Sequence, residues 1–130
     1  MVQELYKKLG ENGCYLFCLY DVATEYSYVV RHPDYTDVAY FIKNGWLDNE
    51  MFVKNPEKIL KYLTGINWNV EKRLYIPEDN KRHFIIKCYS YKNVNHFCRT
   101  TFDPLDKSNC KEKGICESIR VCTPLKYKDI

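Results

Sequence analysis

The chain has 130 residues, of which 45% are hydrophobic and 28% are charged, and its formal net charge is +3. This length and balance predict one globular domain, residues 1–130, with its own hydrophobic core. An aromatic content of 15% excludes a disordered chain. No stretch approaches the roughly 18 apolar residues of a membrane span, and residues 1–8 lack the apolar segment of a secretory signal. We therefore expect a cytoplasmic protein without a membrane partner.

The chain contains seven cysteines, an odd number that does not suit a secreted disulfide framework. Cys14 and Cys18 share one helix face, but no second pair has the close spacing of a structural zinc site. We therefore expect neither a metal nor another cofactor. Small buried thiols of the core are the expected role of five of the other cysteines, namely Cys18, Cys88, Cys98, Cys116 and Cys122.

The first half of the chain, about residues 1–65, has the apolar spacing of helices. Residues 2–9 form the first predicted helix, which Gly10 is expected to end. The segment from about 13 to 26 opens with Cys14 and is apolar over most of its surface, so it predicts a buried central helix.

Two further helices are predicted from their end signals. Asp34 or Thr36 can cap a helix that ends at Asn44-Gly45. Asn55-Pro56 combines a capping residue with proline at the first helical position, and this helix is expected to stop at Thr64-Gly65.

The second half, about residues 66–125, is rich in aromatic and β-branched residues between turn signals. The predicted strands cover residues 67–75, 82–91, 96–102 and 115–122. Helices followed by strands predict an α+β domain in which the helices pack on a C-terminal antiparallel sheet.

Cys14 is the residue on which we expect any chemistry of this chain to depend. The unpaired amides and the dipole at a helix N-terminus favour a thiolate over a thiol, and the thiolate is the nucleophile. A histidine on a strand could serve as its general base, and a carboxylate on the next strand could orient that histidine. Asp103, in Asp103-Pro104, is the candidate carboxylate, although this pair also suits a simple turn.

Two histidines compete for the role of base. A tight hairpin with its turn at Arg99-Thr100 sets His96 opposite Asp103, but this turn lacks the glycine or asparagine that such turns prefer. A longer hairpin centred near Asn93 has the better turn and sets His83 opposite Asp103. The residues alone therefore slightly favour His83.

The third histidine, His32, is followed by Pro33 and is expected to be an ordinary surface residue in a loop.

The chain also resembles an uncharacterised family of small bacterial and prophage-encoded proteins, which we interpret as minimal papain-like cysteine peptidases. The resemblance rests on Gly13-Cys14-Tyr15-Leu16-Phe17-Cys18-Leu19, Asn95-His96-Phe97, Phe102-Asp103-Pro104-Leu105, Ser108, Gly114, Ser118 and Arg120-Val121. It implies a papain-like fold with Cys14 as the nucleophile, His96 as the base and Asp103 as the orienting residue. On this resemblance we choose His96 over His83.

Papain-like enzymes usually carry a glutamine shortly before the cysteine as a donor to the oxyanion. Here Gln3 lies far upstream across Gly10, and Asn12 is nearly adjacent to Cys14, so neither matches that pattern. Losing such a donor typically costs about a hundredfold or more in rate.

Two functions follow as hypotheses. The first is a cysteine hydrolase that cleaves a peptide, isopeptide or other amide bond. The second is a catalytically inactive papain-like module that binds a protein partner, which the surplus of tyrosines would suit. Nucleic-acid binding through Lys87 to Lys92, where aromatic residues are interleaved with basic ones, is a weaker alternative.

Overall fold

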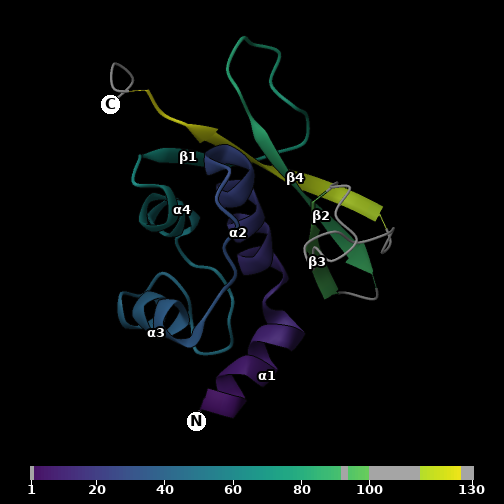
Figure 1. Cartoon of the computed structure of the whole chain (residues 1–130). Coiled ribbons are helices and arrows are strands. Elements are labelled where there is room, and N and C mark those ends of the chain that lie inside the picture. Colours follow the sequence, from purple (N-terminus) through teal and green to yellow (C-terminus); the bar gives the residue numbers. More distant parts are fainter. Residues whose placement is uncertain (1, 92–93, 100–114, 127–130) are drawn as a thin grey trace.

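The computed structural model describes residues 2–91, 94–99 and 115–126 (Figure 1). Within these residues, four helices are followed by four strands. The helices are α1 (Val2–Asn12), α2 (Cys14–Ser27), α3 (Tyr35–Lys43) and α4 (Pro56–Thr64). The strands are β1 (Trp68–Arg73), β2 (Phe84–Tyr91), β3 (Val94–Cys98) and β4 (Ile115–Pro124). The predicted α+β order is confirmed. None of the described helices is long and apolar enough to cross a bilayer.

The four strands form one antiparallel sheet in the order β1-β4-β2-β3. Strand β3 is an edge strand, and it pairs with β2 through Tyr91↔Val94 and Lys87↔Cys98. This register places the hairpin turn at residues 92–93, near the turn of the longer predicted hairpin, but it is one residue away from the register that would set His83 opposite Asp103. The alternative turn at Arg99-Thr100 would have paired residues beyond 99, which lie outside the described part.

Local capping explains where α3 begins and where α4 begins and ends. The side chain of Asp34 accepts a hydrogen bond from the backbone N–H of Asp37, and that of Asn55 accepts one from Lys58, as the sequence predicts. Helix α4 ends at Gly65, whose φ of 81° requires the left-handed region that glycine adopts easily. The first helix differs from its prediction, because it continues through Gly10 to Asn12. A lone glycine on an exposed helix face weakens a helix without ending it.

The core lies between the helices and one face of the sheet, which we call the inner face. Helix α2 packs against α4 and β3, and α4 packs against β1, so α2 is the central helix (Figure 1). The sheet contributes alternate residues to this core, as expected when successive side chains point to opposite faces. Inner-face residues include Trp68, Val70, Phe84, Ile86, Phe97 and Cys122.

The cysteines divide into three groups. Cys18, Cys88 and Cys122 are buried free thiols, as predicted. Burial raises the pKa of Cys122 to about 12, which keeps this thiol protonated and unreactive. Two predictions were wrong: Cys116 is exposed, and Cys98 takes part in a disulfide. The accessible thiols of the described part are therefore Cys14, which is half-buried, and Cys116.

Candidate active site

Cys14 is the first residue of α2, as predicted. The residue before it, Gly13, makes no side-chain cap, so no side chain satisfies the first amides of the helix. Leu9 at the end of α1 approaches Gly13 so closely that the Gly13 N–H donates to the Leu9 carbonyl at 2.8 Å. The helix break between α1 and α2 thereby fixes Cys14 at the N-terminal end of the central helix.

The thiol of Cys14 reaches the edge of the sheet. Its Sγ accepts a hydrogen bond from the backbone N–H of Phe97 on β3, with 3.5 Å between the sulfur and the nitrogen. Phe97 directly follows His96 in the chain. The Phe97 nitrogen lies about 2.4 Å from the Cα of His96, so this Cα is within about 6 Å of the sulfur.

Two further contacts hold β3 against α2. The ring of Tyr15 stacks on that of Phe97 with 4.2 Å between the ring centroids. Burial raises the pKa of Tyr15, and the neighbouring Arg120 opposes only part of that rise, so Tyr15 stays a neutral phenol. The guanidinium of Arg120 also lies over the Phe97 ring, 5.3 Å from its centroid.

Beyond the end of β3, Arg99 binds two carboxylates of α2. It lies 3.1 Å from Asp21 and 2.5 Å from Glu25, and its side chain is buried. The Arg99–Asp21 pair is largely buried, and removing one partner of such a pair strongly destabilises a protein because the other charge is left uncompensated. Sequence reasoning missed these α2–β3 contacts, since nothing in the local pattern shows which helix faces β3.

The structure describes two of the three predicted site residues, Cys14 and His96, and only the backbone of His96 lies close to Cys14. Cys14 and the backbone of His96 come together at the α2–β3 contact. The half-buried His96 pairs with Tyr89 across the sheet. Because Phe97 faces α2, the side chain of His96 leaves β3 on the opposite, outer face. Asp103 lies outside the described residues.

The candidate oxyanion donors lie at the start of the chain. Gln3 is exposed on α1. The amide of Asn12 donates to the backbone carbonyl of Glu50 at 3.0 Å. The loop that carries Glu50 therefore ties the end of α1 in place, and it uses the Asn12 amide to do so.

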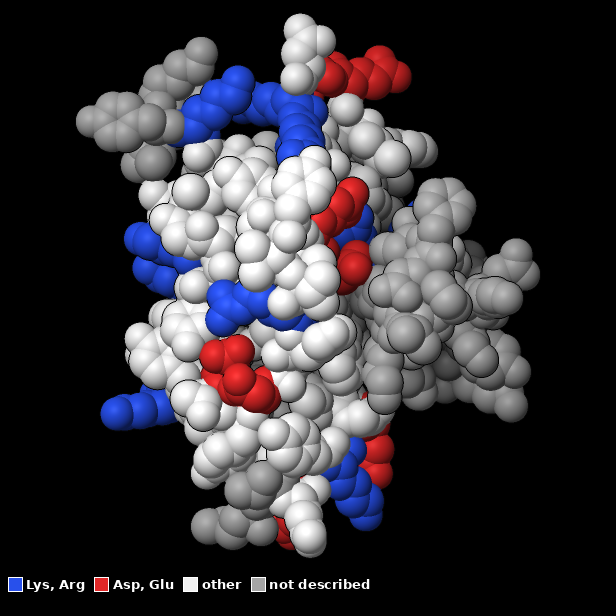
Figure 2. Space-filling view, in the orientation of Figure 1, with Lys and Arg blue, Asp and Glu red and all other residues white. Residues whose placement is uncertain are grey.

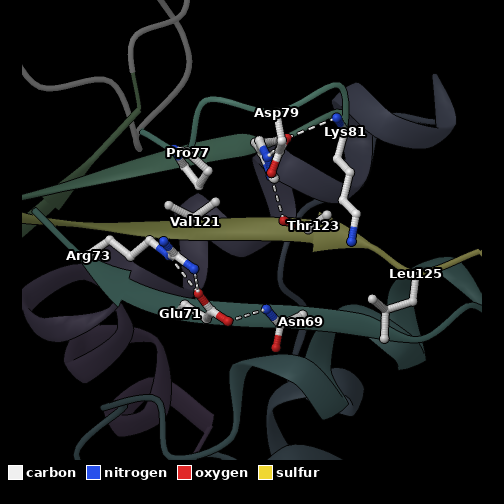
Figure 3. A pocket seen from close by; sticks show the side chains of 10 residues that line it. Asn69, Glu71, Arg73, Pro77, Asp79, Lys81, Val121, Thr123 and Leu125 are labelled. Atoms are coloured by element: carbon white, nitrogen blue, oxygen red, sulfur yellow. Dashed lines mark hydrogen bonds and ion pairs between the residues drawn. The ribbon is translucent and has the colours of Figure 1, made fainter. Parts of the chain in front are cut away.

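His83 lines a separate pocket on the outer face of the sheet. Figure 3 shows this pocket, with Asp79 and Thr123 among its lining residues. Its Nε2 lies 2.7 Å from the carboxylate of Asp79, and its Nδ1 lies 2.6 Å from the hydroxyl of Thr123. A carboxylate only accepts hydrogen bonds, so Nε2 carries the ring hydrogen and donates a hydrogen bond to Asp79. In the neutral ring, Nδ1 then accepts from Thr123. Both ring nitrogens are thus engaged there.

His83 is also distant from Cys14 along the sheet. It precedes β2, whereas the Cys14 contact is at Phe97, which pairs with Cys88. Five residues of strand separate His83 from that position, a length of about 17 Å. His32 is exposed in the loop between α2 and α3, as expected.

The Asp79 side chain gives the outer-face pocket a pH dependence. The backbone N–H of Lys81 and the His83 ring both donate to it, and they hold its pKa below the ordinary carboxylate value. Because the pKa of Asp79 is lower in the folded state than in the unfolded state, its ionised carboxylate stabilises the fold at pH values above the unfolded-state pKa of about 4. This stabilisation is lost as the pH falls through the folded-state pKa. We expect Asp79→Asn to lower the free energy of unfolding at pH 6 and to have no effect at about pH 2.

Urea unfolding at the two pH values checks this prediction. Glu78→Gln is the matched control, because the described residues give the Glu78 carboxylate no hydrogen bond or ion pair. An equal loss of stability in Asp79→Asn at pH 2 and at pH 6 would contradict the claim that the ionised Asp79 carboxylate stabilises the fold.

Comparison with known proteins places the chain in a family. A model of the family DUF261, described as proteins of unknown function, matches residues 2–123. No curated protein and no solved structure matches the chain. The match covers all the described helices and nearly all of the sheet. The chain therefore belongs to the DUF261 family.

Proposed function

We propose that this protein is a thiol hydrolase of papain-like fold that cleaves a peptide, isopeptide or other amide bond. Cys14 is the nucleophile, His96 the general base and acid, and Asp103 the residue that orients His96. The observation that carries the proposal is the contact of the Cys14 sulfur with the Phe97 amide, one residue from His96. Cysteine at the start of a central helix packed on an antiparallel sheet is also the arrangement that a papain-like site requires.

The proposed reaction proceeds in two steps. The thiolate of Cys14 attacks the carbonyl carbon of the scissile bond and forms a thioester, while His96 donates a proton to the departing amine. Water then attacks the thioester with His96 as base, which releases the acid and restores the thiol. For this chemistry the His96 ring must turn around the outer edge of β3 toward Cys14, and the position of its Cα within about 6 Å makes that reach feasible.

Alkylation of the native protein tests the Cys14–His96 pair. We expect iodoacetamide at pH 7 to modify Cys14 at least about tenfold faster than the exposed Cys116, because a neighbouring base increases the thiolate population. His96→Gln should remove most of that advantage and leave Cys116 unchanged. Peptide mass spectrometry reports both thiols in one sample.

His83→Gln serves as the matched histidine control, because His83 lies in the outer-face pocket. Equal rates for Cys14 and Cys116 would end the proposal. So would an equal slowing of Cys14 in both histidine variants, because a general disturbance of the sheet would then explain the loss.

A second function is favoured by a different observation. The His96 side chain leaves β3 on the face opposite α2, and the amide of Asn12 is bound to Glu50 rather than open to an oxyanion. Both features suit a catalytically inactive module that binds a protein partner. A Cys14→Ala variant that keeps every cellular phenotype of the wild type would favour this function.

A further inference from the structure

A second cavity lies at the end of the sheet that is remote from Cys14. Its volume is about 630 Å³, within the usual range for small-molecule sites. It is lined by the C-terminal turn of α2, the segment that leads into β2 and the end of β4. The lining residues are Tyr26, Ile66, Asn80, Lys81, Arg82, Pro124, Leu125 and Lys126. It adjoins the outer-face pocket, because Lys81 and Leu125 line both (Figure 3).

The charge of this cavity has one sign. Lys81, Arg82 and Lys126 contribute three cations, and none of the described lining residues is acidic. Within the described part of the chain, neither Lys81 nor Arg82 forms an ion pair with a carboxylate. Figure 2 shows basic side chains at the upper end of the molecule, with acidic side chains beside them. The three cations therefore favour an anionic ligand, and a phosphate group matches such a cluster well.

Arg82 is held in place before any ligand binds. Its guanidinium carbon lies 4.6 Å from the centroid of the Phe84 ring, in a cation–π contact. Phe84 is itself packed edge-on against Trp68 and Tyr26. Because a preorganised side chain loses less conformational entropy on binding, this stacking increases the affinity that Arg82 can contribute.

The remaining lining is apolar. Ile66, Pro124 and Leu125 are half-buried, and the Tyr26 ring is fixed by its edge contact with Trp68, at 5.1 Å between centroids. Among the described residues, the Tyr26 hydroxyl has no hydrogen-bond partner. A ligand with an apolar or planar body could pack on these side chains while its anionic group meets the cations.

We propose that this cavity binds a small phosphomonoester whose planar or apolar body lies against Tyr26 and Leu125. Lys81 and Arg82 bind the phosphate, and Lys126 adds to the positive charge. This site is independent of Cys14, and the proposal does not rest on the hydrolase function.

Phenyl phosphate is the probe, and inorganic phosphate and phenol are its two halves. Titration of the full-length ¹⁵N-labelled chain, followed by NMR, should give saturable shifts of the amides of Asn80, Lys81 and Arg82. Because burying a phenyl ring adds apolar contact, phenyl phosphate should bind at least about tenfold more tightly than either half. An equal affinity for inorganic phosphate would overturn the proposal. So would the absence of a saturable shift at about 20 mM phenyl phosphate, a concentration at which even weak, millimolar binding is detected.

Charge-removing variants assign the site. Lys81→Gln and Arg82→Gln should each weaken binding about fivefold, the upper end for an exposed ion pair, and the double variant should weaken it further. Arg73→Gln is the control, because Arg73 is bound to Glu71 in the adjoining pocket. An unchanged affinity in the double variant, or an equal loss in Arg73→Gln, would assign the binding elsewhere and refute the proposal.

Discussion

Phe41→Ala is expected to lower the free energy of unfolding by about 3–5 kcal/mol. Phe41 lies on α3 with no exposed surface, and its ring contacts those of Tyr20, Trp46 and Tyr62. Removing the ring loses its burial and leaves a cavity that these neighbours fill only in part. Because single domains are stable by only about 5–15 kcal/mol, the variant should be close to unfolding at ambient temperature.

Urea unfolding of the full chain measures this loss. Phe52→Ala is the control, because the Phe52 side chain is 51% exposed and its truncation should cost about 0.5 kcal/mol or less. Similar losses in the two variants would show that the core is not centred where we place it.

Gly13→Ala should lower the free energy of unfolding by about 1–3 kcal/mol or more. A Cβ atom at Gly13 would lie 2.3 Å from the backbone carbonyl oxygen of Leu9 and 2.7 Å from its Cδ1. The φ of Gly13 is −84°, which alanine adopts without strain, so the collision alone causes the loss. Relief of the collision requires α1 and α2 to move apart, which shifts Cys14 relative to Phe97.

Gly10→Ala gives the opposite expectation and is the matched control. A Cβ atom at Gly10 meets nothing within 4 Å, and Gly10 lies inside α1. Alanine there should raise the free energy of unfolding by about 0.5–1 kcal/mol. If both variants were equally stabilising, the close approach of Leu9 and Gly13 would be refuted.

Much of the fold could be predicted because its signals are local. Asn55-Pro56 and Thr64-Gly65 bound α4 through capping chemistry that acts within one turn. The helix that opens at Cys14 and the strand that ends at Tyr91 follow in the same way from apolar patterns and turn residues. The prediction failed at Gly10, because nothing in the sequence shows that this glycine faces open space.

The candidate site was less predictable because it depends on contacts between distant segments. Cys14 and Phe97 lie far apart in the sequence, and only the packing of α2 on β3 brings them together. The ion pairs of Arg99 with α2 and the binding of His83 to Asp79 and Thr123 likewise depend on tertiary packing. The residue types of the site could be read from the sequence. Which of them lie near Cys14 depends on how β3 pairs with β2 and packs on α2.

Buried polar contacts were also beyond the sequence. Asp37 is buried and accepts hydrogen bonds from the hydroxyls of Tyr20 at 2.6 Å and Tyr62 at 3.0 Å. Burial raises the pKa of Tyr20, so this phenol remains a neutral donor. In the sequence Asp37 reads only as an acidic residue in the first turn of α3. Its role as an acceptor for two tyrosines depends on α2 and α4 packing beside it.

The separation of the Cys14 sulfur from the His96 ring in a crystal structure of the wild-type chain tests the central claim most directly. With a peptide aldehyde bound to Cys14 in that structure, we expect the His96 ring to have turned from the outer face toward Cys14, with one ring nitrogen within about 4 Å of the sulfur, near hydrogen-bond reach. A His96 ring packed on the outer face of the sheet, with both nitrogens beyond that distance, would contradict a Cys14–His96 pair.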